Sequence, residues 1–289
     1  MILLNNHPVE FITFPNNERR LDVNTEHLLD DNTVIWHYKD DSSIFELLLF
    51  NKSMTQLEET YELVIAYMPY SRMDRVQEDA TAFSLEMLVS ILANQLTYVT
   101  NIYIFDPHST VTLKLFKFHK LPACELPYSL AENVFTNNQV DLEDTWVVFP
   151  DKGAAERYNF DAYPNVIICE KTRDFATGQI TGMSARIHKM TGKLGRSTKL
   201  VVVDDLCSYG GTFVRALAAV KENPYVAVKE AWLIVSHAEN VITKGEVLKE
   251  FDKVFTTDSI YSAAFESELQ DKITITPIAD IAKSSVSKP

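Results

Sequence analysis

Short apolar runs, rich in β-branched residues, alternate along the chain with segments of helical period. Most of the runs are apolar at consecutive positions, which is typical of strands buried on both faces of a parallel sheet. Two segments place their large apolar residues on one helical stripe, which predicts helices at 84–96 and 212–220. The repeated order of strand and helix predicts an α/β fold. The predicted strands are 63–67, 102–105, 146–149, 166–169, 200–203, 231–235, 254–257 and 273–275.

The alternation is interrupted between residues 128 and 144, where Asn, Asp and Glu follow the prolines Pro122 and Pro127. A chain of 289 residues is long enough for two domains, at roughly 150 residues per domain. We therefore expect a boundary in this segment, which gives domains 1–135 and 136–289.

A second unusual segment, 172–197, lies between two predicted strands and is long for a connection between them. Loops of this length are usually functional lids or disordered insertions. The segment is locally basic although the whole chain is acidic, and we expect a loop whose cations could close over a reacting phosphate. Its basic residues are Arg173, Arg186, His188, Lys189, Lys193 and Arg196.

Composition narrows the class of protein. With 46% hydrophobic and 23% charged residues, the chain is expected to be globular. Its net charge of -13 disfavours nucleic acids and anionic membranes as partners, because both would be repelled. The three cysteines are widely spaced and form no CxxC pair, so they indicate neither a disulfide framework nor a zinc site. No apolar stretch approaches the roughly 18 residues of a membrane span, and we expect a cytoplasmic location.

The sharpest chemical signal is the run from Leu200 to Phe213, in which an apolar strand ends in two carboxylates and a turn of small residues opens a helix. Glycines allow the backbone to approach a ligand, and the N–H groups at a helix start favour a phosphate. Carboxylates at a strand end can accept hydrogen bonds from sugar hydroxyls. The run therefore suits a sugar phosphate, and the alternative is an ordinary strand-to-helix turn with solvated acids. Its polar and glycine positions are Asp204, Asp205, Ser208, Tyr209, Gly210, Gly211 and Thr212.

This run resembles the phosphoribosyl-diphosphate-binding fingerprint of type I phosphoribosyltransferases and ribose-phosphate diphosphokinases. Further segments resemble the diphosphokinases in the same order along nearly the whole chain, which a simple phosphoribosyltransferase would not reproduce. The resemblance implies two tandem Rossmann-like domains of the type I phosphoribosyltransferase fold with mostly parallel sheets, the C-terminal tail being able to pack on the first domain. The matching segments are Phe14-Pro-Asn-Asn-Glu18, Met68-Pro-Tyr-Ser-Arg-Met-Asp-Arg75, Phe105-Asp-Pro-His108, Phe149-Pro-Asp-Lys-Gly153, Lys171-Thr-Arg173 and Ser285-Val-Ser287.

The resemblance implies an enzyme that transfers the β,γ-diphosphate of ATP to the 1-hydroxyl of ribose 5-phosphate with Mg²⁺ and releases AMP. It assigns ATP binding to Arg72, Asp74, Arg75 and His108. It also implies that Phe14 and Glu18 complete the adenine pocket of a neighbouring subunit, in a homo-oligomer built from dimers, of which a hexamer is one form. Without the resemblance, the two arginines are a solvated face and Asp74 is their ion-pair partner.

The resemblance assigns Mg²⁺ binding to His108 and Asp151, and the catalytic cations to Lys171 and Arg173. It assigns the sugar phosphate to the turn at residues 204–212. The alternatives are a structural histidine at position 108 and a loop ion pair of Lys171 or Arg173 with Asp174 or Glu170.

The turn departs from the family's usual Asp-Asp-x-x-Asp-Thr pattern, because Ser208 and Tyr209 replace the third Asp and the Thr. A bulky ring could stack on a base or line a wider opening, which favours an acceptor larger than ribose 5-phosphate. We expect ADP-ribose as the acceptor, giving ADP-ribose pyrophosphate for NAD synthesis, as in the phage ADP-ribose pyrophosphate synthetases, with ribose 5-phosphate a close second. For a phage enzyme the location is the host cytoplasm. The alternatives are a phosphoribosyltransferase and a non-catalytic regulatory relative.

Overall fold

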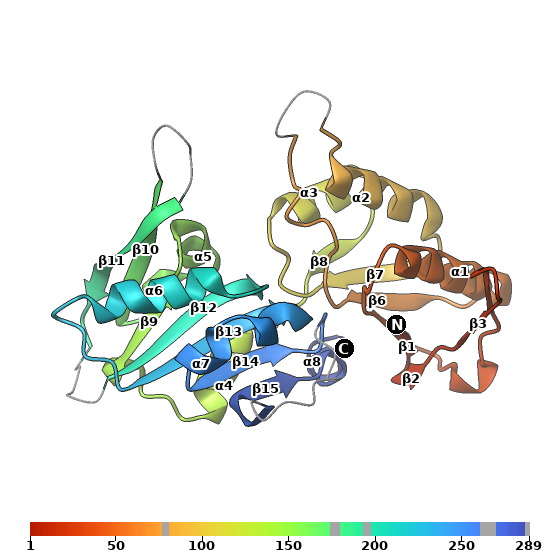
Figure 1. Ribbon diagram of the computed structural model, residues 1–289. Helices are drawn as coiled ribbons and strands as arrows, with labels where there is room; N and C mark the ends of the chain where they lie inside the picture. Colours follow the sequence, from red (N-terminus) through yellow and green to blue (C-terminus); the bar gives the residue numbers. More distant parts are fainter. Residues whose placement is uncertain (77–80, 174–179, 193–197, 261–269, 287–289) are drawn as a thin grey trace. The chain divides into compact units, whose positions relative to one another are not determined.

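The computed structural model describes residues 1–76, 81–173, 180–192, 198–260 and 270–286 (Figure 1). The chain forms two compact units. Unit 1 comprises Met1–Tyr128 together with the residues from Pro277 onward, and unit 2 comprises Ser129–Thr276. Each unit has its own sheet and its own core.

Unit 1 is built on a mixed sheet with the strand order β2-β1-β5-β6-β7-β8. Strands β5 to β8 are parallel, and β1 pairs antiparallel with β5. A separate hairpin, β3-β4, precedes β5 in the sequence. The bounds are β1 Ile2–Leu4, β2 His7–Pro8, β3 Phe11–Thr13, β4 Arg19–Leu21, β5 Asn32–Trp36, β6 Tyr61–Ile65, β7 Val99–Ile104 and β8 Ala123–Glu125.

Both faces of this sheet are covered, because successive side chains of a strand point to opposite faces. On β6, Leu63 and Ile65 pack into the core that α1, α2 and α3 share. Val64 points the other way, into a second cluster with Ile278 and Ile281 of α8. The last described helix of the chain therefore completes unit 1. The helices are α1 Ser42–Leu57, α2 Ser84–Gln95, α3 Val111–Phe118 and α8 Ile278–Ser285.

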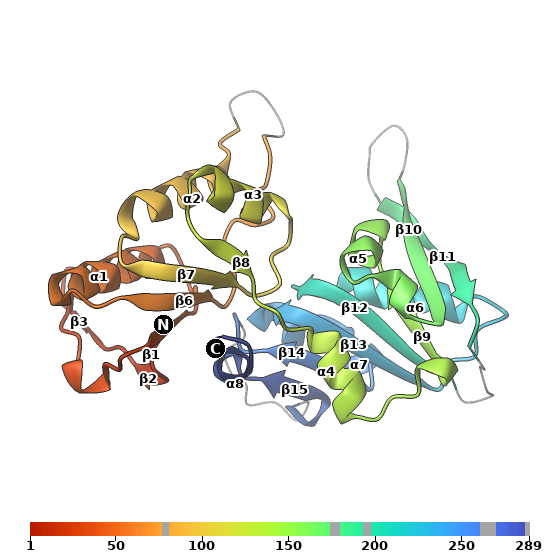
Figure 2. The ribbon, with the colours of Figure 1, turned by 180° about the vertical axis from the view of Figure 1, so that it is seen from behind.

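Unit 2 has the strand order β11-β10-β9-β12-β13-β14-β15, in which only β11 is antiparallel to its neighbour among the described strands. Helices α6 and α7 lie on one face of this sheet (Figure 1), and α4 and α5 lie on the other (Figure 2). The strands are β9 Thr145–Phe149, β10 Asn165–Arg173, β11 Ile180–Met190, β12 Lys199–Cys207, β13 Glu230–Ala238, β14 Lys253–Thr257 and β15 Ile273–Thr276. The helices are α4 Leu130–Asn137, α5 Lys152–Arg157, α6 Gly211–Lys221 and α7 Val247–Glu250.

The predicted α/β fold with mostly parallel sheets is confirmed. All eight predicted strands are present with shifted ends, and β12 and β13 are each longer by several residues. The prediction of a continuous loop over 172–197 was wrong, because residues 180–190 form β11 and pair with β10. Met183, Ala185 and Ile187 alternate along β11 and pack against the core of unit 2. Residues 174–179 and 193–197 lie outside the described part.

Among the described helices, none has both the length and the apolar character that crossing a bilayer requires.

Candidate functional site

The loop after β6 carries the predicted nucleotide-binding residues of unit 1, and Asp74 lies buried within it. Its carboxylate accepts hydrogen bonds from Arg75, from Nε at 2.7 Å and from Nη2 at 3.1 Å. The bond from Arg75, together with a bond from Ser109 and the charge of His108, holds the pKa of Asp74 below its usual range although burial raises it. The carboxylate therefore fixes the Arg75 guanidinium at this edge of the sheet.

Tyr70 anchors the same loop to the start of α1. Its backbone has a φ of 63°, in the left-handed region, and its carbonyl accepts the N–H of Met73 at 2.8 Å. Its hydroxyl donates to Asp41, which also accepts the hydroxyl of Tyr38 at 2.9 Å. This bond raises the pKa of Tyr70. No pattern in the sequence indicated Asp41, because a single acid before a helix is not distinctive.

His108 follows β7, which lies beside β6 in the parallel part of the sheet. It comes two residues after Asp106, whose φ of 37° marks a tight change of direction at the strand end. Because His108 affects the pKa of Asp74, the structure brings the β6 and β7 loops together. Arg72 lies exposed in the first of these loops. Four of the six predicted ATP-binding residues thus lie at one edge of unit 1.

The other two, Phe14 and Glu18, lie at the tip of the β3-β4 hairpin, and both are exposed. The N–H of Phe14 donates to the carbonyl of Glu18 at 2.8 Å and closes the turn. Asn17 has a φ of 66°, a conformation that asparagine tolerates better than most residues. Figures 1 and 2 place this hairpin beyond α1, on the side away from α3. The structure therefore does not bring it together with the β6 and β7 loops.

In unit 2, Asp151 and Lys171 lie at the carboxyl ends of the adjacent strands β9 and β10. Lys171 Nζ lies 3.1 Å from Asp151 Oδ2, and the other carboxylate oxygen accepts the N–H of Ala154 at the start of α5. A predicted metal ligand and a predicted catalytic cation thus form an ion pair. Arg173 ends β10, and its side chain lies outside the described part.

Asp204 and Asp205 lie on the next strand, β12. Burial, followed by the charge and hydrogen bond of Asp205, raises the pKa of Asp204 well above its usual range, and the charge of Asp151 adds to the shift. Asp205 is buried as well, but its Oδ2 lies 3.1 Å from an Nη of Arg157 in α5. Sequence reasoning missed Arg157, because only the strand order places α5 against β12.

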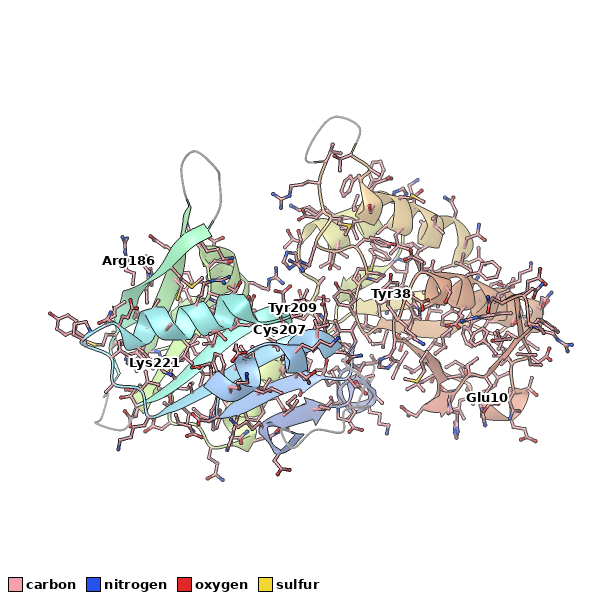
Figure 3. All side chains as sticks on the ribbon, viewed as in Figure 1. Glu10, Tyr38, Arg186, Cys207, Tyr209 and Lys221 are labelled. Atoms are coloured by element: carbon pink, nitrogen blue, oxygen red, sulfur yellow. The ribbon has the colours of Figure 1, made fainter. Side chains whose placement is uncertain are left out.

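The turn between β12 and α6 is held by close packing. Gly210 has a φ of 78°, and a Cβ there would meet Val247 Cγ2 at 1.9 Å, so only glycine fits. The Ser208 hydroxyl donates to Glu239 Oε2 at 2.6 Å, a partner that the sequence did not indicate. The Tyr209 side chain is 58% exposed and extends from the turn near Cys207 (Figure 3). Gly211 and Thr212 begin α6, whose first N–H groups face this turn.

The residues of unit 2 fit Mg²⁺ in their chemistry, because Asp151 offers a half-exposed carboxylate at the edge of the sheet. Among the described residues, no three His, Cys, Asp or Glu side chains form a metal-binding group. Mg²⁺ usually keeps several waters and is held by one or two carboxylates together with substrate phosphates, so a dense cluster is not required.

Comparisons with known proteins agree with this arrangement. No model of a protein family matches the chain. The chain is 30% identical over 258 residues to the ribose-phosphate pyrophosphokinase of Thermococcus kodakarensis. The aligned residues cover 87% of this chain and 85% of the relative. It is 26% identical over 272 residues to the enzyme of the same name from Pyrococcus abyssi, covering 92% and 88%.

The fold is similar to a solved structure as well. The crystal structure of phosphoribosylpyrophosphate synthetase from Mycobacterium smegmatis matches with a TM-score of 0.70 and 16% identity, covering 96% of this chain and 88% of that chain. These two pyrophosphokinases are matched over most of their length. The chain therefore belongs to the ribose-phosphate pyrophosphokinase family and is an ATP-dependent diphosphotransferase.

Proposed function

We propose that the chain transfers the β,γ-diphosphate of ATP to the anomeric hydroxyl of ADP-ribose in preference to ribose 5-phosphate. The observation that carries this preference is the exposed Tyr209, which stands in the phosphate turn where the family pattern has a small hydroxyl residue. An aromatic ring at the mouth of the turn offers a surface on which an acceptor extended by a nucleoside can stack. A compact 5-phosphate gains nothing from such a ring.

ATP binds to unit 1 in this proposal. Arg72 and Arg75 bind its phosphates, because guanidinium groups match phosphate oxygens with paired donors. Asp74 keeps Arg75 in place through its two hydrogen bonds. Phe14 and Glu18 complete the adenine pocket of a second subunit, which is consistent with their exposure at the tip of a hairpin and requires a homo-oligomer.

The acceptor binds to unit 2. Asp204 and Asp205 accept hydrogen bonds from the ribose hydroxyls, and the turn formed by Ser208, Gly210, Gly211 and Thr212 holds the phosphate. The anomeric oxygen attacks the β-phosphorus in line, and the bond from that phosphorus to the AMP oxygen breaks. Lys171 and Arg173 neutralise charge on the transferring group.

Mg²⁺ neutralises phosphate charge when it is bound with ATP. His108 and Asp151 are its proposed protein ligands. Because Lys171 pairs with Asp151 at 3.1 Å, Lys171 is already held beside the proposed metal site before the nucleotide arrives. The ion pair thus positions one of the two proposed catalytic cations.

The test follows AMP release by the full chain with ATP, Mg²⁺ and either acceptor. We expect kcat/KM for ADP-ribose to exceed that for ribose 5-phosphate, and Tyr209→Thr to reverse the order. Equal or better turnover of ribose 5-phosphate by the wild-type enzyme would refute the acceptor preference and leave the family assignment intact.

A further inference from the structure

The turn after β12 has a carboxylate as its nearest charged partner. Ser208 Oγ donates to Glu239 Oε2 at 2.6 Å, and the N–H of Glu239 donates to the carbonyl of Cys207 at 2.8 Å. Glu239 is therefore fixed through its backbone and its side chain at once. The hydrogen of the Ser208 hydroxyl is used in this bond, so it is not available to a phosphate oxygen.

The charges of two carboxylates, Asp204 and Glu239, act on Cys207 at the end of β12. Burial raises the pKa of the Cys207 thiol, and the charges of Asp204 and Glu239 raise it further. The turn packs closely against the segment that follows Glu239, because a Cβ on Gly245 would lie 2.0 Å from the Tyr209 carbonyl oxygen. The two segments are thus packed in contact, and an anion in the turn lies close to Glu239.

The donors that remain are few. They are the guanidinium of Arg215, which lies beside Gly211, the first N–H groups of α6 and the hydroxyl of Thr212, since the Ser208 hydroxyl is engaged. A phosphate monoester carries between one and two negative charges at pH 7 and has three terminal oxygens to satisfy. A phosphate that bridges to a second group carries one charge and has two terminal oxygens. The bridging phosphate is repelled less than the terminal monoester by the carboxylate of Glu239, which is bonded to Ser208.

We infer that Glu239 is a specificity-determining residue, which together with Ser208 makes the turn select a singly charged bridging phosphate over a terminal phosphate monoester. The inference rests on the proposed function, because it concerns the acceptor phosphate of the same site. It adds that the enzyme distinguishes acceptors by phosphate charge, independently of their size. The acceptor class is therefore ribose 5-phosphate esterified on its phosphate.

A small phosphate ester can distinguish the effect of phosphate charge from the effect of acceptor size. The phosphate of ribose 5-(methyl phosphate) is singly charged, like the phosphate on the terminal ribose of ADP-ribose, but the ester is nearly as small as ribose 5-phosphate. At pH 8 we expect the wild-type enzyme to use the methyl ester with a kcat/KM about tenfold higher than that of ribose 5-phosphate. The advantage shrinks as the pH falls toward about 6, where the dianionic monoester takes up one proton and becomes a monoanion. Equal kcat/KM values for the two compounds at pH 8 would overturn the inference. This experiment uses the wild-type enzyme alone.

Glu239→Gln removes the charge and keeps an oxygen that can accept the Ser208 bond. We expect kcat/KM for ribose 5-phosphate to rise about tenfold and that for the methyl ester to change less than about threefold. The matched control is Glu246→Gln, an exposed residue 3.0 Å from Lys249, which should leave the ratio unchanged. If Glu239→Gln leaves the ratio of the two acceptors as in the wild type, the inference is wrong. If ADP-ribose proves no better than ribose 5-phosphate while the methyl ester does, the proposed acceptor fails and the inference stands.

Discussion

Two aspartates with restricted solvent access, Asp74 in the loop after β6 and Asp204 within β12, have pKa values that move in opposite directions. Asp74 is held ionised by donors from Arg75 and Ser109. Burial and the neighbouring Asp205 instead raise the pKa of Asp204. Burial alone therefore does not decide the charge of a carboxyl, because the groups that touch it do.

The difference corresponds to two kinds of ligand. A carboxylate bonded to a guanidinium positions a cation for a polyphosphate. Two adjacent carboxyl groups, of which Asp205 pairs with Arg157, favour neutral donors such as sugar hydroxyls. The comparison thus supports the proposed division of the substrates, with ATP on unit 1 and the sugar on unit 2, and three experiments can break or sharpen it.

The largest effect is expected in unit 2, at Lys171. Replacing it by alanine removes a positive charge proposed to act on the transferring group, and we expect kcat for AMP release to fall about a thousandfold. The KM for ATP should change much less, because the proposed ATP phosphate contacts lie in unit 1. Steady-state kinetics with varied ATP measure both quantities.

The control for this variant is Lys152→Ala, which removes a lysine that is 83% exposed and pairs with Glu156 on the surface of α5. Its activity should match that of the wild type. A near-normal rate for Lys171→Ala would remove this residue from the transfer step and would favour a non-catalytic role for the chain.

A smaller effect is expected on the free energy of unfolding, where variants of Arg157 and Arg75 can be compared. Arg157→Met leaves Asp205 buried without its ion-pair partner, and we expect a loss of about 3 kcal/mol in the free energy of unfolding by urea. Arg75→Met should lose less, because the Arg75 side chain is 74% exposed and Asp74 keeps its bond from Ser109. Adding Asp205→Asn to Arg157→Met should recover part of the loss. Equal losses for both arginines would contradict the contrast between the units.

The smallest effect is the pH dependence of stability. Asp204 has a raised pKa, so its contribution is present below the ordinary value of 3.8 and is lost as the pH rises through the raised pKa. Asp74 has a lowered pKa, so its contribution is present above 3.8 and is lost as the pH falls through the lowered pKa. Each slope is at most about 1.4 kcal/mol per pH unit.

Urea unfolding between pH 3 and 8 measures these slopes. Asp204→Asn should flatten the loss of stability above pH 4, and Asp74→Asn should flatten the loss below it. Parallel pH profiles for the two variants would show that the carboxyl groups do not differ as described.

The sequence predicted the sheets well where strands are apolar on both faces, as in β9 and β12. It missed β11, because cations such as Arg186 and Lys189 mask a regular alternation with Met183, Ala185 and Ile187. It also missed β5, although Val34 and Trp36 are completely buried. Alternation across a half-exposed edge strand is a weak signal unless its pairing partner is known.

The residues of the candidate site also fall into those that the sequence predicted and those that it did not. Residues in motifs at strand ends, such as Asp74 and Asp204, can be found from the sequence, because their neighbours in the chain share their function. Arg157, Glu239 and Asp41 cannot, since each is a single charged residue whose partner lies far along the chain. Only the strand order and the helix positions bring these pairs together.

Helix α8 has a consequence for how the protein is made. Its Ile278 and Ile281 cover Val64 and Phe105 of unit 1, yet they are synthesised after all of unit 2. While the ribosome is still translating unit 2, one face of the first sheet has no cover and exposes apolar side chains. A stop codon before α8 would therefore damage unit 1, which the opposite end of the gene encodes, while leaving the elements of unit 2 complete.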